Sequence, residues 1–560
     1  MADNSIGTAE QLRDPNYTPP LAQAIPLGIQ HVMAMFVSNV TPAIIVAGAA
    51  GFGFGSNSPD FPELLYLIQM SMLFAGVATL LQTVTIGPVG AALPIVQGTS
   101  FAFLPIMIPL VAGKGVDALA ALFGGVLIGG LFHAALGTVI GKIRFALPPL
   151  VTGLVVTMIG LALVKVGIQY AAGGVPAIGT PEYGSLLNWS AALVVILVTL
   201  GLKFFARGML SVSAVLVGLL VGYVYALAVG ILSVGAITGS WTNAAAFALP
   251  QPFKYGFEFS AAAVIGFCLM AFISAIETVG DVSGITKGGA GREATDKEIS
   301  GATFADGFGT AIAGIFGGLP NTSFSQNVGL IAMTGVMSRH VVTVGAIFLI
   351  ICGLVPKVGG VIRTVPIEVL GGGVIVMFGM VVAAGISMLS DVDWNRRNLV
   401  IFAISLSVGL GLQLEPGAVQ HLPDTARILM TSGLLPAALI AIVLTLVTGG
   451  LTFAVMGKPV GEALYTFFVA PLTSYYGMTE WIVKATPLIL IGIGLSLGFR
   501  ANVWNIGAEG QYTIGAILGG GVAIFNYEST SPLLLPAMLA AGVLGGMAWA
   551  AIPALLKTRF

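Results

Sequence analysis

Long apolar runs, nearly free of charged side chains, constrain this chain more than any other feature. Five of them lie at 120–140, 150–164, 191–202, 212–232 and 434–447. With their flanks they approach the roughly 20 apolar residues that a membrane-spanning helix needs. Only 8% of the 560 residues are charged, whereas about a quarter are charged in a soluble domain. The sequence therefore predicts an all-α polytopic membrane protein.

Basic residues gather in loops that are separated by two spans each. They are Lys142, Arg144, Lys203, Arg207, Lys287, Arg292, Lys297, Arg339, Arg396 and Arg397. Because cytoplasmic loops hold an excess of Lys and Arg, we expect these loops and the N-terminal tail, residues 1–20, in the cytoplasm and the chain in the cell (inner) membrane. A net charge of −1 argues against nucleic-acid binding.

Two interrupted segments echo each other in the two halves of the chain. They are PIVQGTSFAFLP at 94–105 and PNTSFSQNVGLIAMTG at 320–335, and both contain Thr-Ser-Phe soon after a proline. Non-helical backbone at membrane depth must be buried in protein or line a watery cavity, and polar side chains can satisfy it. Paired broken segments of this kind indicate a midplane binding site in a secondary transporter. The alternative is a pair of re-entrant loops without a ligand.

Three carboxylates lie within or beside apolar spans. Glu277 and Asp281 are four residues apart, which places them on one face of a helix. A carboxylate costs about 2.5 kcal/mol or more at the centre of a spanning helix, so it is a functional candidate there. The alternative is that the helix ends and the pair is solvated. Asp306 can share a proton network with them, and His31 is either a coupling group or a buried histidine.

The segment QNVGLIAMTG, residues 326–335, resembles the signature motif of the nucleobase-ascorbate transporter family, also called the xanthine and uracil permeases. That motif has Gln, Glu or Pro, then Asn, one residue, Gly, four residues, Thr, and Arg, Lys or Gly, and every fixed position is met. Further similar runs are QH at 30–31, TSFAF at 99–103, ETVGD at 277–281, ADG at 305–307 and DWNRRN at 393–398. The resemblance covers about 19–448.

The resemblance implies a fold of 14 spans built as two inverted seven-span repeats within 21–450. Spans 1 to 4 and 8 to 11 would form a core domain that carries two broken helices and short crossing strands. Spans 5 to 7 and 12 to 14 would form a gate domain, through which the family suggests a homodimer.

The resemblance also assigns roles to residues. Glu277 would accept hydrogen bonds from ring N–H groups, Gln326 would hydrogen-bond the base, and Phe101 would stack near the ring and offer its amide. The substrate site is completed by Ser100, Phe324 and Asn327. Asp281, Asp306 and His31 are the ion-coupling candidates, and neither a metal nor a cofactor is expected.

The substrate class depends on residue 326. Family members that resemble uracil permeases usually have Glu there, and those for xanthine and uric acid usually have Gln. A carboxamide both donates and accepts, which suits an oxopurine, and Asp281 stands where uracil members tend to have His. We therefore expect a purine such as xanthine or uric acid, with uracil as the alternative, carried across the bilayer by H⁺ symport, with Na⁺ left open.

The last part of the chain departs from this family. Residues 485–520 contain FRANVWNIGAEGQ and resemble the start of permease subunits of nucleoside- and sugar-type ABC importers, over about 451–560, with three or four extra helices. Three interpretations stay open: a joining of two neighbouring genes of one uptake region, with a truncated second part; a genuine fusion; or a membrane subunit of an ATP-driven nucleoside importer. The sequence has no Walker A run, so another chain would have to hydrolyse ATP.

Overall fold

The computed structural model describes residues 7–53, 59–140, 149–207, 209–390, 392–455, 508–526 and 533–559, with a few isolated residues between 456 and 532. The predicted basic loop with Lys142 and Arg144, and residues 499–507 of the tail motif, lie outside the described residues. The chain divides into two compact units, residues 1–446 and residues 447–560.

The first unit is helical apart from two three-residue strands. After α1 (Ala9–Arg13), its first stretch contains α2 (Leu21–Ala50), α3 (Phe61–Val84), β1 (Gln97–Thr99), α4 (Leu104–Val111) and α5 (Ala118–Leu136). Five helices follow: α7 (Pro149–Ala171), α8 (Leu186–Phe205), α9 (Met209–Val212), α10 (Ala214–Ala228) and α11 (Val234–Asn243).

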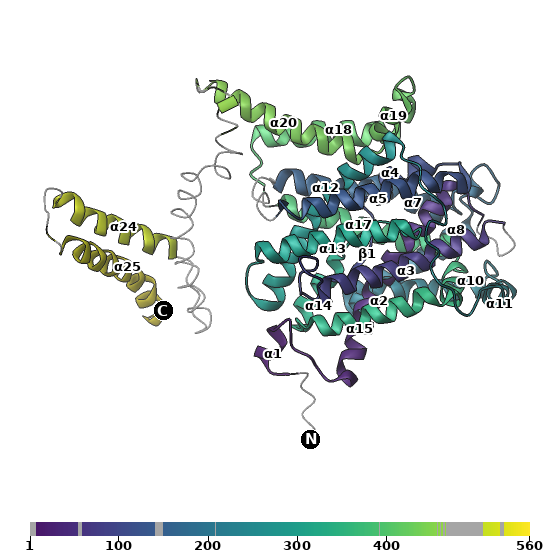
Figure 1. Cartoon of the computed structure of the whole chain (residues 1–560), viewed down its shortest axis with the longest axis horizontal. Helices are drawn as coiled ribbons and strands as arrows, with labels where there is room; N and C mark the ends of the chain where they lie inside the picture. The colour runs from purple at the N-terminus through teal and green to yellow at the C-terminus, as the bar shows by residue number, and fades with distance from the viewer. Residues whose placement is uncertain are drawn as a thin grey trace. The chain divides into compact units, whose positions relative to one another are not determined.

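The order of long helix, long helix, short strand, short helix and long helix then recurs. The second stretch contains α12 (Ala261–Ile285), α13 (Asp296–Ile315), β2 (Asn321–Ser323), α14 (Ser325–Thr334) and α15 (Arg339–Leu354). It is followed by α16 (Pro356–Arg363), α17 (Ile367–Leu389), α18 (Arg396–Leu414), α19 (Asp424–Thr431) and α20 (Leu434–Val455). Figure 1 shows β1 in the middle of this unit, surrounded by helices.

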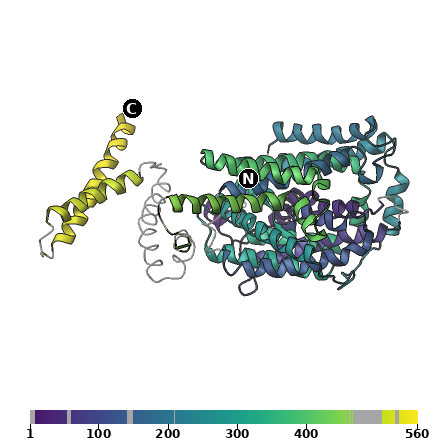
Figure 2. The same cartoon turned by 90° about the horizontal axis from the view of Figure 1, so that it is seen from above.

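Small residues let the long helices approach one another closely, as is common in membrane bundles. A Cβ atom added to Gly307 of α13 would lie 2.1 Å from the amide nitrogen of Ala134 in α5. A Cβ atom added to Gly353 of α15 would lie 2.6 Å from the amide nitrogen of Leu73 in α3. Many of these helices lie side by side in both views (Figure 1, Figure 2).

Ten helices among the described residues are long and apolar enough to cross a membrane, or eleven if α15 and α16, bent by 81° at Val355, count as one span. The five apolar runs of the sequence coincide with α5, α7, α8, α10 and α20. Large apolar side chains such as Leu186, Phe205 and Val224 are more than half exposed, which suits a lipid-facing surface. The chain is therefore a multi-pass membrane protein.

The segment before α2 folds back onto the link between α14 and α15. The carbonyl of Leu12 accepts a hydrogen bond of 2.7 Å from the Met337 amide, and the carbonyl of Pro15 accepts one of 2.9 Å from the Arg339 amide. The segment that contains Leu12 and Pro15 is thus attached to the far end of the second broken helix.

The second unit contains a pair of apolar helices, α24 (Ala508–Phe525) and α25 (Leu534–Arg559). They pack through glycines: a Cβ atom added to Gly515 would lie 2.7 Å from the carbonyl oxygen of Gly542. Of the three or four helices predicted after residue 450, the described residues show these two beyond the end of α20.

Candidate functional site

The two short strands cross in the first unit as an antiparallel pair. The Cα partners are Gln97 with Ser323, Gly98 with Thr322, and Thr99 with Asn321. The residue after each strand extends the pairing, because the Ser100 amide donates to the Pro320 carbonyl at 2.8 Å and the Phe324 amide donates to the Val96 carbonyl at 3.0 Å. The prediction of two broken helices with short crossing strands is therefore confirmed.

Side chains of the surrounding helices satisfy the strand backbone. The Gln97 amide donates to Thr79 Oγ1 of α3 at 2.9 Å, and the Thr99 amide donates to Asn39 Oδ1 of α2 at 2.8 Å. In the second strand, the Asn321 amide donates to Thr310 Oγ1 of α13 at 3.0 Å. An unpaired amide in lipid costs several kcal/mol. This cost explains why the apolar helices carry polar side chains where they face the strands.

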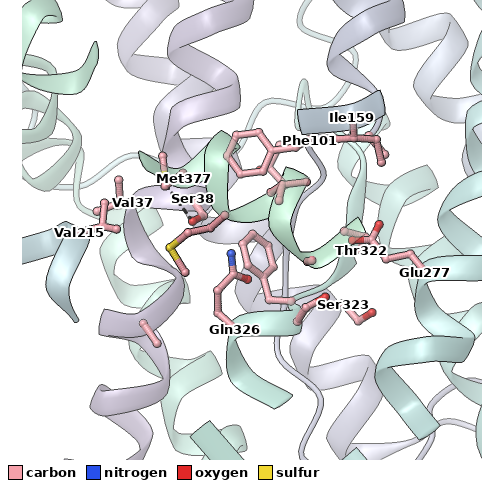
Figure 3. Close-up of a pocket in the computed structure, with 18 of the residues that line it drawn as sticks. Val37, Ser38, Phe101, Ile159, Val215, Glu277, Thr322, Ser323, Gln326 and Met377 are labelled. Atoms are coloured by element: carbon pink, nitrogen blue, oxygen red, sulfur yellow. Dashed lines mark hydrogen bonds between the residues drawn. The ribbon is translucent and has the colours of Figure 1, made fainter. Parts of the chain in front are cut away.

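A cavity of about 300 Å³ lies beside the crossing. Figure 3 shows side chains from both halves of the unit around it. Its polar lining residues are Ser38, Thr99, Lys203, Ser213, Glu277, Thr322, Ser323, Ser325 and Gln326, and its apolar ones include Val37, Phe101, Ile159, Val215, Phe324, Met377 and Val381. The cavity thus combines a mostly apolar wall with a few polar groups, as small-molecule sites do.

Glu277 and Gln326 are two of the four polar residues that sequence reasoning placed against a substrate, and the other two are Ser100 and Asn327. Glu277 and Gln326 both line the cavity, and they can be followed in Figure 3. Glu277 extends from α12 and Gln326 from the first turn of α14. Neither side chain forms a hydrogen bond with the part of the chain that the structure describes. A carboxylate acceptor and a carboxamide are therefore both available to a ligand.

Phe101 and Phe324 end the two Thr-Ser-Phe runs, as the second residue after β1 and the first residue after β2, and both line the cavity. The ring of Phe101 packs edge-on against Phe378 of α17, with centroids 5.3 Å apart and planes at 88°. The contact leaves a flat aromatic surface on the cavity wall. Ser38 donates to Met377 Sδ at 3.3 Å on the same side.

Asp281 lies directly behind the cavity wall. Its carboxylate accepts hydrogen bonds from Ser323 Oγ at 2.6 Å and Ser325 Oγ at 2.7 Å, and both serines line the cavity. The side chain is buried, so the alternative of a solvated carboxylate at the helix end does not describe Asp281. One layer of hydroxyl groups separates this acid from the cavity.

Asp306 is fully buried in α13 and does not line the cavity. It accepts hydrogen bonds from Gln82 Nε2 at 2.8 Å, from Gln97 Nε2 of β1 and from Thr278 Oγ1 of α12. The carboxylate therefore joins α3, the first strand and α12 in one polar network.

His31 and Asn327 form a second buried pair. Asn327 Nδ2 lies 3.0 Å from His31 Nδ1 and donates to the His31 carbonyl at 3.1 Å. Neither Asn327 nor Ser100 lines the cavity, whereas both were predicted as substrate contacts. The Ser100 hydroxyl instead accepts a hydrogen bond from the Ala102 amide at 3.3 Å. Ser100 and Asn327 therefore make contacts within the protein, with Ala102 and with His31, that help to position the two broken helices.

Several polar residues of the site escaped sequence reasoning. Asn39, Thr79, Gln82, Gln97, Thr278 and Thr310 support the crossing, and Lys203 and Ser213 line the cavity. Their common signal is a lone polar side chain in or beside an apolar run, which is the signal that drew attention to Glu277. The described residues contain no group of three or more His, Cys, Asp or Glu that could hold a metal ion.

Comparison with known proteins places the two parts of the chain separately. Residues 22–417 match a family model described as the permease family, the family of the xanthine and uracil permeases. Residues 477–560 match the permease component of the branched-chain amino acid transport system. The second match covers the part of the chain that resembles ABC importer permeases.

Curated relatives cover most of the chain. The uric acid permease PucJ of Bacillus subtilis is 34% identical over 75% of this chain and 91% of its own length. The xanthine permease XanQ of Escherichia coli K12 is 33% identical over 80% of this chain and 96% of its own. Among solved structures, the transmembrane domain of a cyanobacterium bicarbonate transporter, BicA, matches 76% of this chain and 97% of that domain, with 16% identity and a TM-score of 0.44.

The family model and the curated relatives agree with the sequence motifs. The family consists of permeases, not of enzymes, as the sequence predicts. Over residues 22–417, the chain belongs to the xanthine and uracil permease family.

Proposed function

We propose that residues 21–450 form a secondary active transporter that imports a nucleobase, in the first place xanthine or uric acid, by symport with protons and alternating access. The observation that carries this proposal is the pairing of Glu277 and Gln326, both without a protein hydrogen-bond partner among the described residues, in one cavity beside the crossing strands.

The lining suits a planar heterocycle. Glu277 accepts hydrogen bonds from ring N–H groups, and Gln326 both donates and accepts along the edge of the base. Phe101 and Phe324 offer aromatic surfaces to the ring. A site that hydrogen-bonds ring N–H groups discriminates strongly against analogues that lack them, because its buried polar groups are then left unpaired.

The relatives favour purines over the alternative, uracil. The two described above are named as permeases of uric acid and of xanthine. A carboxamide at residue 326 suits the alternating donors and acceptors of an oxopurine, whereas a carboxylate there would suit uracil by the family pattern. Uracil remains the second candidate and belongs in the same assay.

Proton coupling is supported by the positions of the acids. Asp281 contacts the cavity wall through two serines, and Asp306 binds the first strand through Gln97. A carboxyl group that must release its proton before the empty carrier resets would couple transport to the membrane potential, which supplies about 2.3 kcal/mol per charge per 100 mV. His31, held by Asn327, is the third coupling candidate. Na⁺ is the alternative ion.

The family architecture of 14 spans has a counterpart in the element order. Seven spans would be α2, α3, β1 with α4, α5, α7, α8 and α10, and seven more would be α12, α13, β2 with α14, α15, α17, α18 and α20. The antiparallel register of β1 and β2 supports an inverted repeat. We further propose a core of spans 1 to 4 and 8 to 11, a gate of the other six, a cytoplasmic N-terminus in the inner membrane, and a homodimer through the gate.

The C-terminal part is not required for this function. The match to the branched-chain amino acid permease component begins at residue 477, and the compact first unit ends at Leu446. The competing function is a membrane subunit of an ATP-driven nucleoside importer, which rests on this match alone. We propose that residues 451–560 are an ABC-permease-like membrane segment attached to the nucleobase transporter.

The test is uptake of labelled xanthine, urate and uracil by cells that express residues 1–450 or the full chain, with and without a protonophore. We expect protonophore-sensitive purine uptake from both. Glu277→Gln should abolish uptake, whereas Glu258→Gln, which changes an exposed acid that does not line the cavity, should not. Uptake of uracil alone would reverse the substrate assignment. Uptake only by the full chain and insensitive to the protonophore would support the ATP-driven importer, and a response to a sodium gradient alone would exclude protons.

A further inference from the structure

One side of the cavity holds polar groups that the proposed nucleobase contacts do not use. Lys203, in the last turn of α8, and Ser213, Val215 and Leu216, at the start of α10, line the same cavity as Glu277 and Gln326. Glu277 and Lys203 are its two charged lining residues. The cavity therefore has a negative group on α12 and a positive group on α8.

Packing between α8 and α10 brings Lys203 to the beginning of α10. Thr199 Oγ1 contacts the carbonyl oxygen of Ala214 at 3.5 Å, and a Cβ atom added to Gly218 would lie 2.2 Å from that same hydroxyl oxygen. Lys203 lies one helical turn beyond Thr199 on the same face of α8. Its ammonium thus belongs to the face that meets the first turn of α10.

Ser213 is 4% exposed, and its hydroxyl has no hydrogen-bond partner among the described residues. It occupies the N-cap position of the 15-residue helix α10, yet its side chain does not cap that helix. The first amides of a helix have no intrahelical acceptor, and they carry a partial positive charge. The Ser213 hydroxyl and two residues of the first turn of α10, Val215 and Leu216, line the cavity together, and a helix N-terminus with a hydroxyl donor is suited to an anion.

Lys203 adds a full positive charge to this end of the cavity. It forms no ion pair within the part of the chain that the structure describes. An ammonium group, an unpartnered hydroxyl and a helix N-terminus on one wall are suited to an oxyanion, and hydrogen bonds between charged groups are stronger than neutral ones.

We propose that Lys203, Ser213 and the first turn of α10 form an anion subsite that binds an oxopurine anion at a carbonyl oxygen that shares the negative charge of its deprotonated ring. This inference rests on the proposed function and specifies its substrate as the purine monoanion. Urate carries a negative charge at neutral pH, whereas hypoxanthine is neutral. The subsite selects the first over the second, and Glu277 and Gln326 bind the rest of the ring.

The experiment measures the Kd of urate and of hypoxanthine for the purified full chain in detergent at pH 7. We expect Lys203→Gln to raise the Kd of urate about tenfold, as for the loss of one charged hydrogen bond, and to change that of hypoxanthine less than twofold. Lys203→Arg should retain most urate affinity. Arg207→Gln is the matched control, since it removes a nearby exposed charge that does not line the cavity. Ser213→Ala should raise the Kd of urate about threefold.

The possible outcomes distinguish failure of the anion subsite from failure of the proposed nucleobase transport. Failure of the wild type to bind any purine would overturn both. Binding of hypoxanthine but not urate, an equal loss of both ligands in Lys203→Gln, or no loss of urate would overturn the subsite alone. If the wild type binds urate but not hypoxanthine, the two Lys203 variants are compared by their Kd for urate. A higher Kd in Lys203→Gln than in Lys203→Arg would support the subsite, and equal values would overturn it. Competition by inorganic phosphate as strong as that by unlabelled urate would show a general anion site and overturn the purine assignment.

Discussion

The two halves of the crossing share a backbone plan but present different side chains to the cavity. The first half, β1 with α4, continues into a helix whose residues Leu104, Ile106 and Met107 are buried. The second half, β2 with α14, opens with Ser325 and Gln326, which are exposed to the cavity. The first half therefore contributes Phe101 and a single polar residue, Thr99, to the cavity lining. The second half contributes Phe324 and four polar residues, Thr322, Ser323, Ser325 and Gln326.

The supports of the two strands differ in a related way. Asn39 and Thr79 hold the backbone of β1, and Thr310 holds that of β2. In the second half, Ser323 and Ser325 also bind the carboxylate of Asp281. A repeated backbone thus does not imply repeated chemistry, because a position that is structural in one half can bind ligand in the other.

Among the changes that compare the two halves, the largest effect is expected at Gly98, where the two strands are in contact. A Cβ atom added to Gly98 would lie 2.3 Å from the ring of Phe324 and 2.9 Å from Asn39 Oδ1, whereas its partner Thr322 has room for a side chain. Gly98→Val should therefore reduce the amount of folded protein or its uptake at least about tenfold, because overpacking forces the surroundings apart. Thr322→Val is the matched change. The measurement is purine uptake per membrane-inserted protein, and equal effects of the two changes would contradict the asymmetry.

Recognition should depend more on the second half than on the first. Gln326→Ala should raise the KM for xanthine about tenfold through lost hydrogen bonds. Phe101→Ala should raise it about threefold through lost ring contact. Initial-rate uptake at several concentrations measures both values. A larger effect of Phe101→Ala would show that the wall, and not the carboxamide, dominates binding.

A smaller effect is expected from the serines that bind Asp281. Ser325→Ala removes a hydrogen bond of 2.7 Å to that carboxylate, and we expect about threefold lower accumulation against a gradient with little change in KM. Ser100→Ala is the control in the first half, where the hydroxyl accepts from the Ala102 amide. Accumulation ratios with and without a protonophore measure the effect. Equal accumulation ratios in Ser325→Ala and Ser100→Ala would argue that Asp281 takes no part in ion coupling.

The smallest expected effect tests where the halves are alike. Thr79→Val and Thr310→Val each leave one strand amide without its hydroxyl acceptor, and an unsatisfied buried group costs roughly 1–3 kcal/mol. Both should lower the thermal midpoint in detergent by a few degrees and by similar amounts, whereas the exposed Thr238→Val should not. A clear difference between the two buried variants would mean that one strand bears more of the fold's stability.

Much of this site could be predicted because polar residues in apolar spans are costly and therefore conspicuous. The broken segments and Glu277 stood out in this way, and the crossing strands appeared as expected. The roles of Gln326 and Phe101 came from the family resemblance, and both residues line the cavity. The apolar runs likewise marked the helices, since a spanning helix needs little beyond length and hydropathy.

The remainder depends on contacts between distant segments. Gln82 and Gln97 are isolated amides in the sequence, and only their shared acceptor, Asp306, gives them a role. Ser100 and Asn327 belong to conspicuous motifs, yet the direction of each side chain depends on the local turn. In the sequence, Lys203 is one of several basic residues assigned to loops. Only the packing of α8 on α10 shows that it lines the cavity.

The pairing of Gly98 with Thr322 also has a consequence for how the protein is made. These partners are 224 positions apart in the chain, and chains are synthesised at about 5–20 residues per second. The first strand therefore waits roughly 10–45 seconds after its own synthesis before its partner exists. During that delay Asn39 and Thr79, already translated, can occupy its amides, while its remaining edge is open to insertion factors or to another nascent chain.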